Sequence, residues 1–147
     1  MAAKAVKTIK TIEIPCILEN NDLDLFPLKK APSLFHICAS KKFSINVDSM
    51  CNIATGIRLN MPELIIAKNE SVESSFILQA HVSSIHKLCV ERGIIIISPS
   101  IIPVSYTGEL VLLVANIGKK RESFVSGDPI AELWFSLSPN IDLTIKR

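Results

Sequence analysis

Residues 100–135 limit the possible folds of this chain more than any other stretch. A short apolar segment enters a turn that holds Tyr106 and Gly108. Residues 110–115 are then almost all apolar, which is typical of a strand covered on both faces. A Gly-Asp pair at Gly127 marks another turn, and a further apolar run follows it. This order predicts consecutive β-strands joined by tight turns.

Strict alternation of apolar and polar residues predicts further strands elsewhere. It runs through residues 43–47, 57–61 and 141–145, and in residues 76–82 one face is apolar throughout while the opposite face holds Ile77, Gln79 and His81. Many short strands separated by Pro, Gly, Asn and Ser indicate an all-β sandwich or barrel. The residues expected to face its interior are Ile57, Leu59, Leu78, Leu112 and Leu133.

One segment departs from this period. Ile85, Leu88 and Cys89 recur at helical spacing, and Gly93 is a natural stop, so we expect one short helix. A serine at 83 or 84 would cap its first turn. We expect loops at residues 20–24, 67–74 and 116–123. No repeat or linker interrupts the pattern, which predicts a single domain over residues 1–147.

The composition is unusually apolar. Apolar residues make up 48% of the 147 residues and the mean hydropathy is +0.38. No apolar run approaches the roughly 18–20 residues of a membrane span. We therefore assign the excess to a subunit interface and expect a closely packed oligomer with no membrane association. A net charge of +2 is too small to indicate nucleic-acid binding.

The four cysteines form no C-x-x-C pair and lie in apolar or mixed segments. They are typical of reduced thiols, and the lysine-interleaved N-terminus has no continuous apolar signal region. Both features predict an intracellular protein.

Four segments, in order, resemble motifs of the trimeric dUTP diphosphatase (dUTPase) family. Residues 100–110 match G-V-I-D-x-D-Y-R-G-E in outline, and residues 127–133 match G-D-R-I-A-Q-L. Residues 55–62 match T-G-I-x-x-x-x-P, and residues 83–85 match part of R-S-S-L-A. The resemblance covers about residues 31–135. It implies a dUTPase-like β-barrel or sandwich with one short helix, assembled as a homotrimer through residues 110–115 and the C-terminal strands.

The same comparison shows that residues of the family's mechanism are replaced. Pro103 stands where the family has its water-activating aspartate, and Phe35 where it has a metal-associated aspartate. Val82 replaces an arginine, and the Gly-rich fifth motif is missing after Leu143. Proline and phenylalanine neither accept a proton nor coordinate Mg²⁺. We therefore expect no catalytic residues, no metal site and no cofactor, with Mg²⁺ required only by an active family member.

Three residues remain as candidates for nucleotide binding. Ser83 and Ser84 stand where the family holds phosphate oxygens, and Tyr106 where it stacks a tyrosine on the deoxyribose. The simpler interpretation is helix capping for the serines and a turn tyrosine with its ring on the core. His81 and His86 flank the serines without a third ligand nearby, so we expect no metal there.

These observations favour a dUTPase-like protein that has lost hydrolysis and acts as a viral protein-interaction or regulatory module. The alternative is an active dUTP diphosphatase, in which Asp48, Glu63, Glu109 or Asp128 replaces the lost carboxylates. A third possibility is a nucleotide sensor without turnover. Turnover separates the alternative from the others, and dUTP binding separates the sensor from the interaction module.

Overall fold

The structure is a computed structural model that describes residues 11–69 and 72–147. Residues 1–10, on which the expectation of no signal peptide rests, lie outside this range. In the described residues the regular structure is almost entirely antiparallel β-strand with one short α-helix, which confirms the predicted fold class. No described helix is long and apolar enough to cross a membrane.

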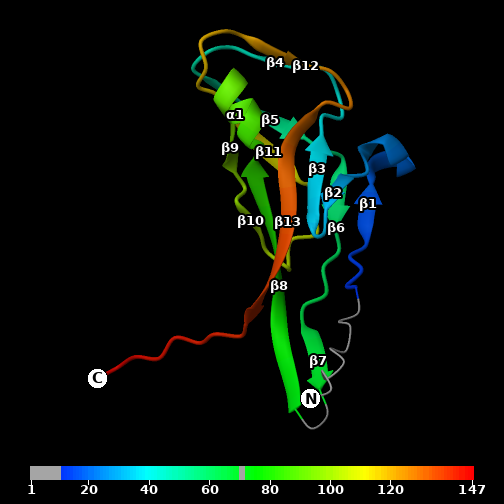
Figure 1. Ribbon diagram of the computed structural model, residues 1–147, viewed down its shortest axis with the longest axis vertical. Coiled ribbons are helices and arrows are strands. Elements are labelled where there is room, and N and C mark those ends of the chain that lie inside the picture. The colour runs from blue at the N-terminus through cyan, green and yellow to red at the C-terminus, as the bar shows by residue number, and fades with distance from the viewer. Residues whose placement is uncertain (1–10, 70–71) are drawn as a thin grey trace, which may run out of the picture.

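The largest sheet contains six strands in the order β10–β8–β13–β3–β2, and β7 also pairs with β8 (Figure 1). Its strands are β2 (Leu28–Ala31), β3 (Leu34–Cys38), β7 (Ile65–Asn69), β8 (Val72–Ser84), β10 (Ile101–Ile102) and β13 (Pro129–Pro139). The two long strands β8 and β13 run side by side through the centre of the molecule (Figure 1). Ser83 and Ser84, described below, lie at the end of β8, and Trp134 lies on β13.

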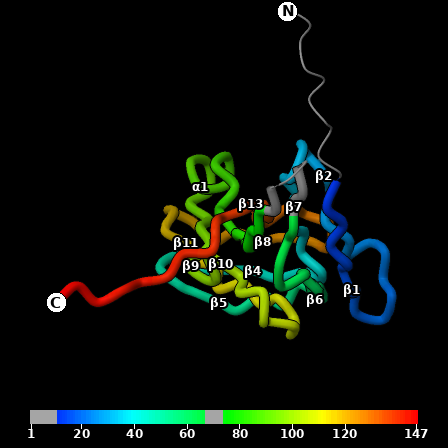
Figure 2. Tube along the Cα trace, turned by 90° about the horizontal axis from the view of Figure 1, so that it is seen from below, coloured from blue at the N-terminus to red at the C-terminus, as the bar shows by residue number. Residues whose placement is uncertain are grey.

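Three smaller sheets complete the fold. A three-stranded sheet has the order β5 (Ser49–Ala54), β11 (Val111–Asn116) and β9 (Ile94–Ser98). The two-stranded pairs are β1 (Cys16–Leu18) with β6 (Ile57–Leu59), and β4 (Phe43–Ile45) with β12 (Glu122–Phe124). Two 3-10 turns, Glu19–Asn21 and Leu23–Leu25, follow β1. The tube view places α1 (His86–Arg92) and β1 on opposite sides of the molecule (Figure 2).

The core lies between the sheets and contains all five residues predicted for it. Ile57 and Leu112 are fully buried, and Leu59, Leu78 and Leu133 are at most 6% exposed. Alternation explains this result, because successive side chains of a strand point to opposite faces. The continuous run at 110–115 is only partly covered on its second face within this chain, since Val111 is 41% exposed and Leu113 is half-buried, whereas Ala115 is buried.

The C-terminal end of helix α1 agrees with the prediction, but its N-terminal end does not. Gly93 ends it in the left-handed conformation at φ 67°, as predicted, and a Cβ there would collide with the backbone of Gly118. The predicted serine cap is wrong. Ile85 is the N-cap residue, and no side chain caps the first turn.

Three other local expectations need correction. Residues 141–145 form no strand, and both views show the C-terminal tail leading away from the body (Figures 1 and 2). Alternation alone forms no strand where no neighbouring strand supplies hydrogen bonds. The loop expected at 67–74 is mostly a β7–β8 hairpin, with residues 70–71 outside the described range. The loop expected at 116–123 is shorter, because β12 begins at Glu122.

Candidate functional site

In the turn between β10 and β11, the side chain of Tyr106 folds back against residues of the same turn. Its backbone amide donates to the carbonyl of Pro103 at 2.9 Å, and its hydroxyl donates to the carbonyl of Glu109 at 2.6 Å. The ring lies so close to Gly108 that a Cβ there would meet the hydroxyl oxygen at 2.9 Å. The side chain is 44% exposed, so the expectation of a ring on the core is wrong. Tyr106 instead packs against its own turn.

The two serines are bonded inside the chain as well. Ser83 accepts a hydrogen bond from the indole Nε1 of Trp134 at 2.9 Å. Ser84 accepts one from the backbone amide of Ile96 at 2.8 Å, which joins the end of β8 to β9. These bonds give both hydroxyls structural roles other than capping α1.

The structure does not bring the serines and Tyr106 together within one chain. Strand β10 is antiparallel to β8, with Ile101 opposite His81 and Ile102 opposite Ala80. Beyond Ile102 the chain therefore runs toward the β7 end of β8, whereas Ser84 lies at the α1 end. A site containing both parts would need a second copy of the chain.

The four carboxylates of the active alternative have different surroundings. Glu109 accepts a hydrogen bond from the amide of Gly56 at 2.9 Å, so one of its carboxylate oxygens is bonded inside the chain. Asp128 accepts one from the amide of Val125 at 2.8 Å, as expected of a turn residue. Asp48 is exposed in a turn at φ 56°. Of the four, only Glu63 shares a pocket with Pro103, a cavity of about 360 Å³.

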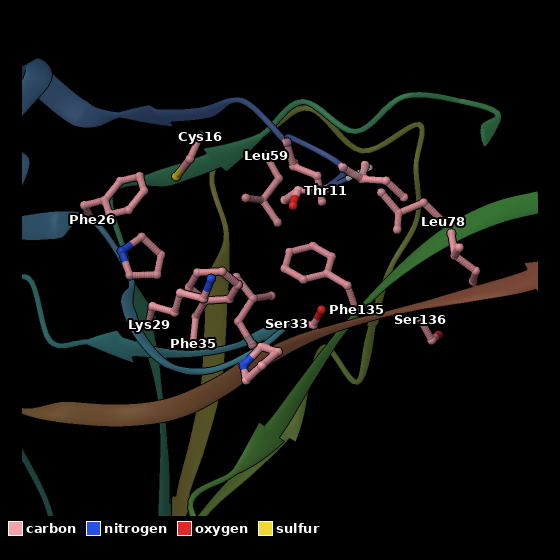
Figure 3. Close-up of a pocket in the computed structure, with 16 residues that line it drawn as sticks. Thr11, Cys16, Phe26, Lys29, Ser33, Phe35, Leu59, Leu78, Phe135 and Ser136 are labelled. Carbon is pink, nitrogen blue, oxygen red and sulfur yellow. The ribbon is translucent and has the colours of Figure 1, made fainter. Parts of the chain in front are cut away.

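Phe35 lies in a different place from Pro103. It sits on β3 opposite Leu133 and packs edge-on against Phe135, with ring centroids 6.1 Å apart. Figure 3 shows both rings in a second, apolar pocket of about 460 Å³. Pro103 and Phe35, the two residues that stand in place of family aspartates in the resemblance, thus line different pockets in this chain, and Phe35 belongs to a largely apolar wall.

A row of side chains on the outer face of the large sheet was not predicted from the sequence. The cross-strand register aligns Leu34, Trp134, His81 and Ile101 on four neighbouring strands. Trp134 stacks on His81 with centroids 4.0 Å apart, and His81 Nε2 lies 2.7 Å from the hydroxyl of Ser136. We call these four residues the outer row. The polar residues Glu132 and Ser136, each two positions from Trp134, place Trp134 on the same, outward face, but only the register shows which strands supply its neighbours.

Beside the outer row, His36 of β3 faces Glu132 of β13. His36 Nε2 lies 3.9 Å from the carboxylate, while the buried Nδ1 has no hydrogen-bond partner. Burial lowers the pKa of His36, the Lys30 charge lowers it further, and Glu132 opposes both effects. In the described residues, no group of three His, Cys, Asp or Glu side chains is arranged to hold a metal ion.

The sequence matches no protein-family model and no curated protein. Solved structures, in contrast, match over most of the chain. EIAV dUTPase superposes with a TM-score of 0.64 at 20% identity, over 82% of this chain and 90% of that one. The dUTPase from phage phi11 of S. aureus gives a TM-score of 0.70 at 13% identity, over 92% and 96%. The Staphylococcus bacteriophage 80alpha dUTPase with dUPNHPP gives 0.71 at 12% identity, over 93% and 88%. The chain therefore has the dUTPase fold.

Proposed function

We propose that this protein is a catalytically degenerate, viral member of the trimeric dUTPase family that acts by binding another protein. The observation that most supports the loss of catalysis is the conformation of the turn between β10 and β11. The Tyr106 ring packs against Gly108 and its hydroxyl donates to the carbonyl of Glu109. The Glu109 carboxylate accepts a hydrogen bond from the amide of Gly56. Pro103 stands where the resemblance places the family's base.

The chemistry of hydrolysis supports the same conclusion. Attack on a phosphate by water requires a group that accepts the proton within about 2.6–3.2 Å. Pro103 has no such group, and Phe35 has none either, its ring packing edge-on against Phe135. Removing a general base costs about 10²–10⁴ in rate. Val82, where the resemblance places the arginine, would lower the rate further because it cannot pair with phosphate.

A homotrimer fits the distribution of apolar surface. Met50 and Val111, on neighbouring strands of the three-stranded sheet, are 64% and 41% exposed, and Ile97 on the third strand is 46% exposed. Ile141 and Leu143 in the C-terminal tail are 73% and 93% exposed. Surfaces of this kind are usually covered in obligate oligomers. A trimer would also supply the second copy needed to join Ser84 to the Tyr106 turn.

The outer row is the surface we assign to a protein partner. Trp134 is 37% exposed and Ile101 is 50% exposed, and tryptophan is enriched among the residues that dominate binding energy. The Staphylococcus bacteriophage 80alpha dUTPase is described as one of the phage dUTPases that control transfer of virulence genes by a proto-oncogenic G protein-like mechanism. This fold can therefore serve regulation, and the matched viral and phage structures are consistent with a viral source.

Titration calorimetry with dUTP tests the proposal against the sensor. The interaction module predicts no saturable heat with dUTP, with or without Mg²⁺, at micromolar protein. Saturable binding without turnover would identify a nucleotide sensor instead. A Tyr106→Phe variant breaks the bond to Glu109, and binding that appears only in this variant would show that the closed turn excludes the nucleotide.

The position of Glu63 favours one specific version of the active alternative. It lines the same pocket as Pro103 and is exposed to solvent, so it is the carboxylate best placed to replace the base. If the wild-type protein hydrolyses dUTP, Glu63→Gln should lower the turnover rate by about 10²–10⁴-fold. Asp128→Gln is the matched control, because Asp128 is occupied in its own turn.

A further inference from the structure

A cavity lined by Phe35 and Phe135 contains no residue of the outer row and none of the Tyr106 turn. It has a volume of about 460 Å³, within the roughly 300–1,000 Å³ range of small-ligand pockets. Its walls come from the segment around β1, from the turn before β2, and from the inward-facing side chains of β3 and β13. Figure 3 shows Phe26, Phe35 and Phe135 arranged around the open space.

Alternation in the N-terminal segment builds one wall of this cavity. Ile12, Ile14 and Cys16 line it, whereas Glu13, Pro15 and Ile17 are exposed. Burial raises the pKa of the Cys16 thiol, in keeping with an apolar wall. The cavity is open to solvent on one side, since Phe26 is 52% exposed and Leu137 is 44% exposed. A ligand can therefore enter without unfolding the chain.

The charge pattern of the lining restricts the ligand. Among the lining residues that the structure describes, Lys29 is the only charged one, and none is Asp or Glu. The remaining polar groups are small: Thr11, Ser33, Ser136 and the Cys16 thiol. A ligand that fits this pattern has an apolar body and a single negative group placed at Lys29.

We propose that this cavity binds a monocarboxylate with a long apolar chain, a fatty acid, with the chain between Phe26, Phe35 and Phe135 and the carboxylate at Lys29. The apolar chain supplies most of the affinity by leaving water. The lysine, which is exposed, adds a smaller preference for an anionic head group. The cavity shares Phe35 with the argument for lost hydrolysis but contains no residue of the Tyr106 turn and neither serine, so failure of fatty-acid binding would leave the hydrolysis test unaffected.

The test is titration of the full-length protein with octanoate, laurate and palmitate, each compared with its methyl ester. Affinity should rise with chain length, and each carboxylate should bind more tightly than its ester. Lys29→Gln should weaken carboxylate binding by about two- to five-fold and leave ester binding unchanged. Lys30→Gln is the matched control, because Lys30 neighbours Lys29 on β2 but does not line the cavity.

A second pair of variants tests the apolar wall. Phe26→Ala should weaken binding of every probe by roughly ten-fold, since about half of the ring is already exposed without ligand. Ile17→Ala, at a similarly exposed position outside the cavity, should change affinity less than two-fold. Equal effects of Phe26→Ala and Ile17→Ala on affinity would contradict binding of the apolar chain in this cavity.

Absence of saturable binding by any probe would overturn the proposal. So would binding that appears only after residues 140–147 are removed, because the cavity would then be a dock for the chain's own C-terminal tail. Equal affinity for carboxylates and esters, unaffected by Lys29→Gln, would overturn the assignment of the head group.

Discussion

Removing the side chain of Arg92 should destabilise the protein far more than an ordinary surface substitution. Arg92 Nε donates to the carboxylate of Glu122 at 2.7 Å, and its Nη2 donates to the carbonyl of Ser123 at 3.0 Å. The guanidinium also lies 4.3 Å from the centre of the Phe124 ring. These contacts tie the end of α1 to β12 and so fix the helix that follows Ser84.

The magnitude follows from what Arg92→Ala leaves behind. The Glu122 side chain is only 8% exposed, and its other oxygen has no partner, so the variant buries an unpaired carboxylate. Breaking a buried ion pair costs about 3–5 kcal/mol. Arg92 is itself 31% exposed, so water reaches one side of the pair, and we expect about 2–3 kcal/mol. For a chain of this length that loss lowers the melting temperature by about 4–12 °C.

Thermal and urea melts at a fixed protomer concentration measure this effect, because the stability of an oligomer depends on concentration. Arg121→Ala, an exposed neighbour in the same region, should stay within about 0.5 kcal/mol of the wild type. The double variant Arg92→Met/Glu122→Leu should lose less than the sum of its two single variants, since no buried charge is left unpaired. An Arg92→Ala loss no larger than that of Arg121→Ala, or strict additivity in the double variant, would refute this reasoning.

Three further predictions concern the core, pH and assembly. Leu112→Ala should cost about 2–5 kcal/mol in a urea melt, because Leu112 is fully buried, and a loss below 1 kcal/mol would contradict its place in the core. Because the pKa of His36 is lowered from 6.5 in the folded state, the unfolded chain binds the proton first as pH falls. Unfolding free energy should therefore decrease as pH falls from about 7 through 6.5, and less so in His36→Gln; identical pH profiles would exclude His36 as the cause. Light scattering should give about three times the 16.2 kDa chain mass, and a stable monomer at micromolar concentration would contradict the trimer.

Burial patterns were predictable from the sequence where one side of a strand faces the core. Alternation identified Leu59 and Leu78, and the continuous run identified Leu112, because hydrophobic burial acts on each strand locally. Gly93 was predictable for a similar reason, since only a residue that tolerates positive φ can end the helix there.

The polar contacts were not predictable in the same way. Ser84 is suited by its chemistry to a helix cap, but it bonds to Ile96, which the fold brings alongside it. Tyr106 was expected on the core, but the lack of a Cβ at Gly108 lets its ring fold over the turn. The outer row depends on the register of four strands, and no local pattern specifies that register. Residues 141–145 have the alternation of a strand without a partner strand in this chain.

The most direct test of the proposed function is release of pyrophosphate from dUTP in the presence of Mg²⁺. We predict no release above background from the wild-type protein, because Pro103 stands where the resemblance places the family's base and Tyr106 is hydrogen-bonded within its own turn. We also predict that Pro103→Asp alone will not restore activity, because Phe35 and Val82 would still stand where the resemblance places the second carboxylate and the arginine. An active dUTPase assayed in parallel is the positive control. Turnover by the wild-type protein within the usual enzymatic range of about 1–10³ per second would contradict the account and establish the active alternative.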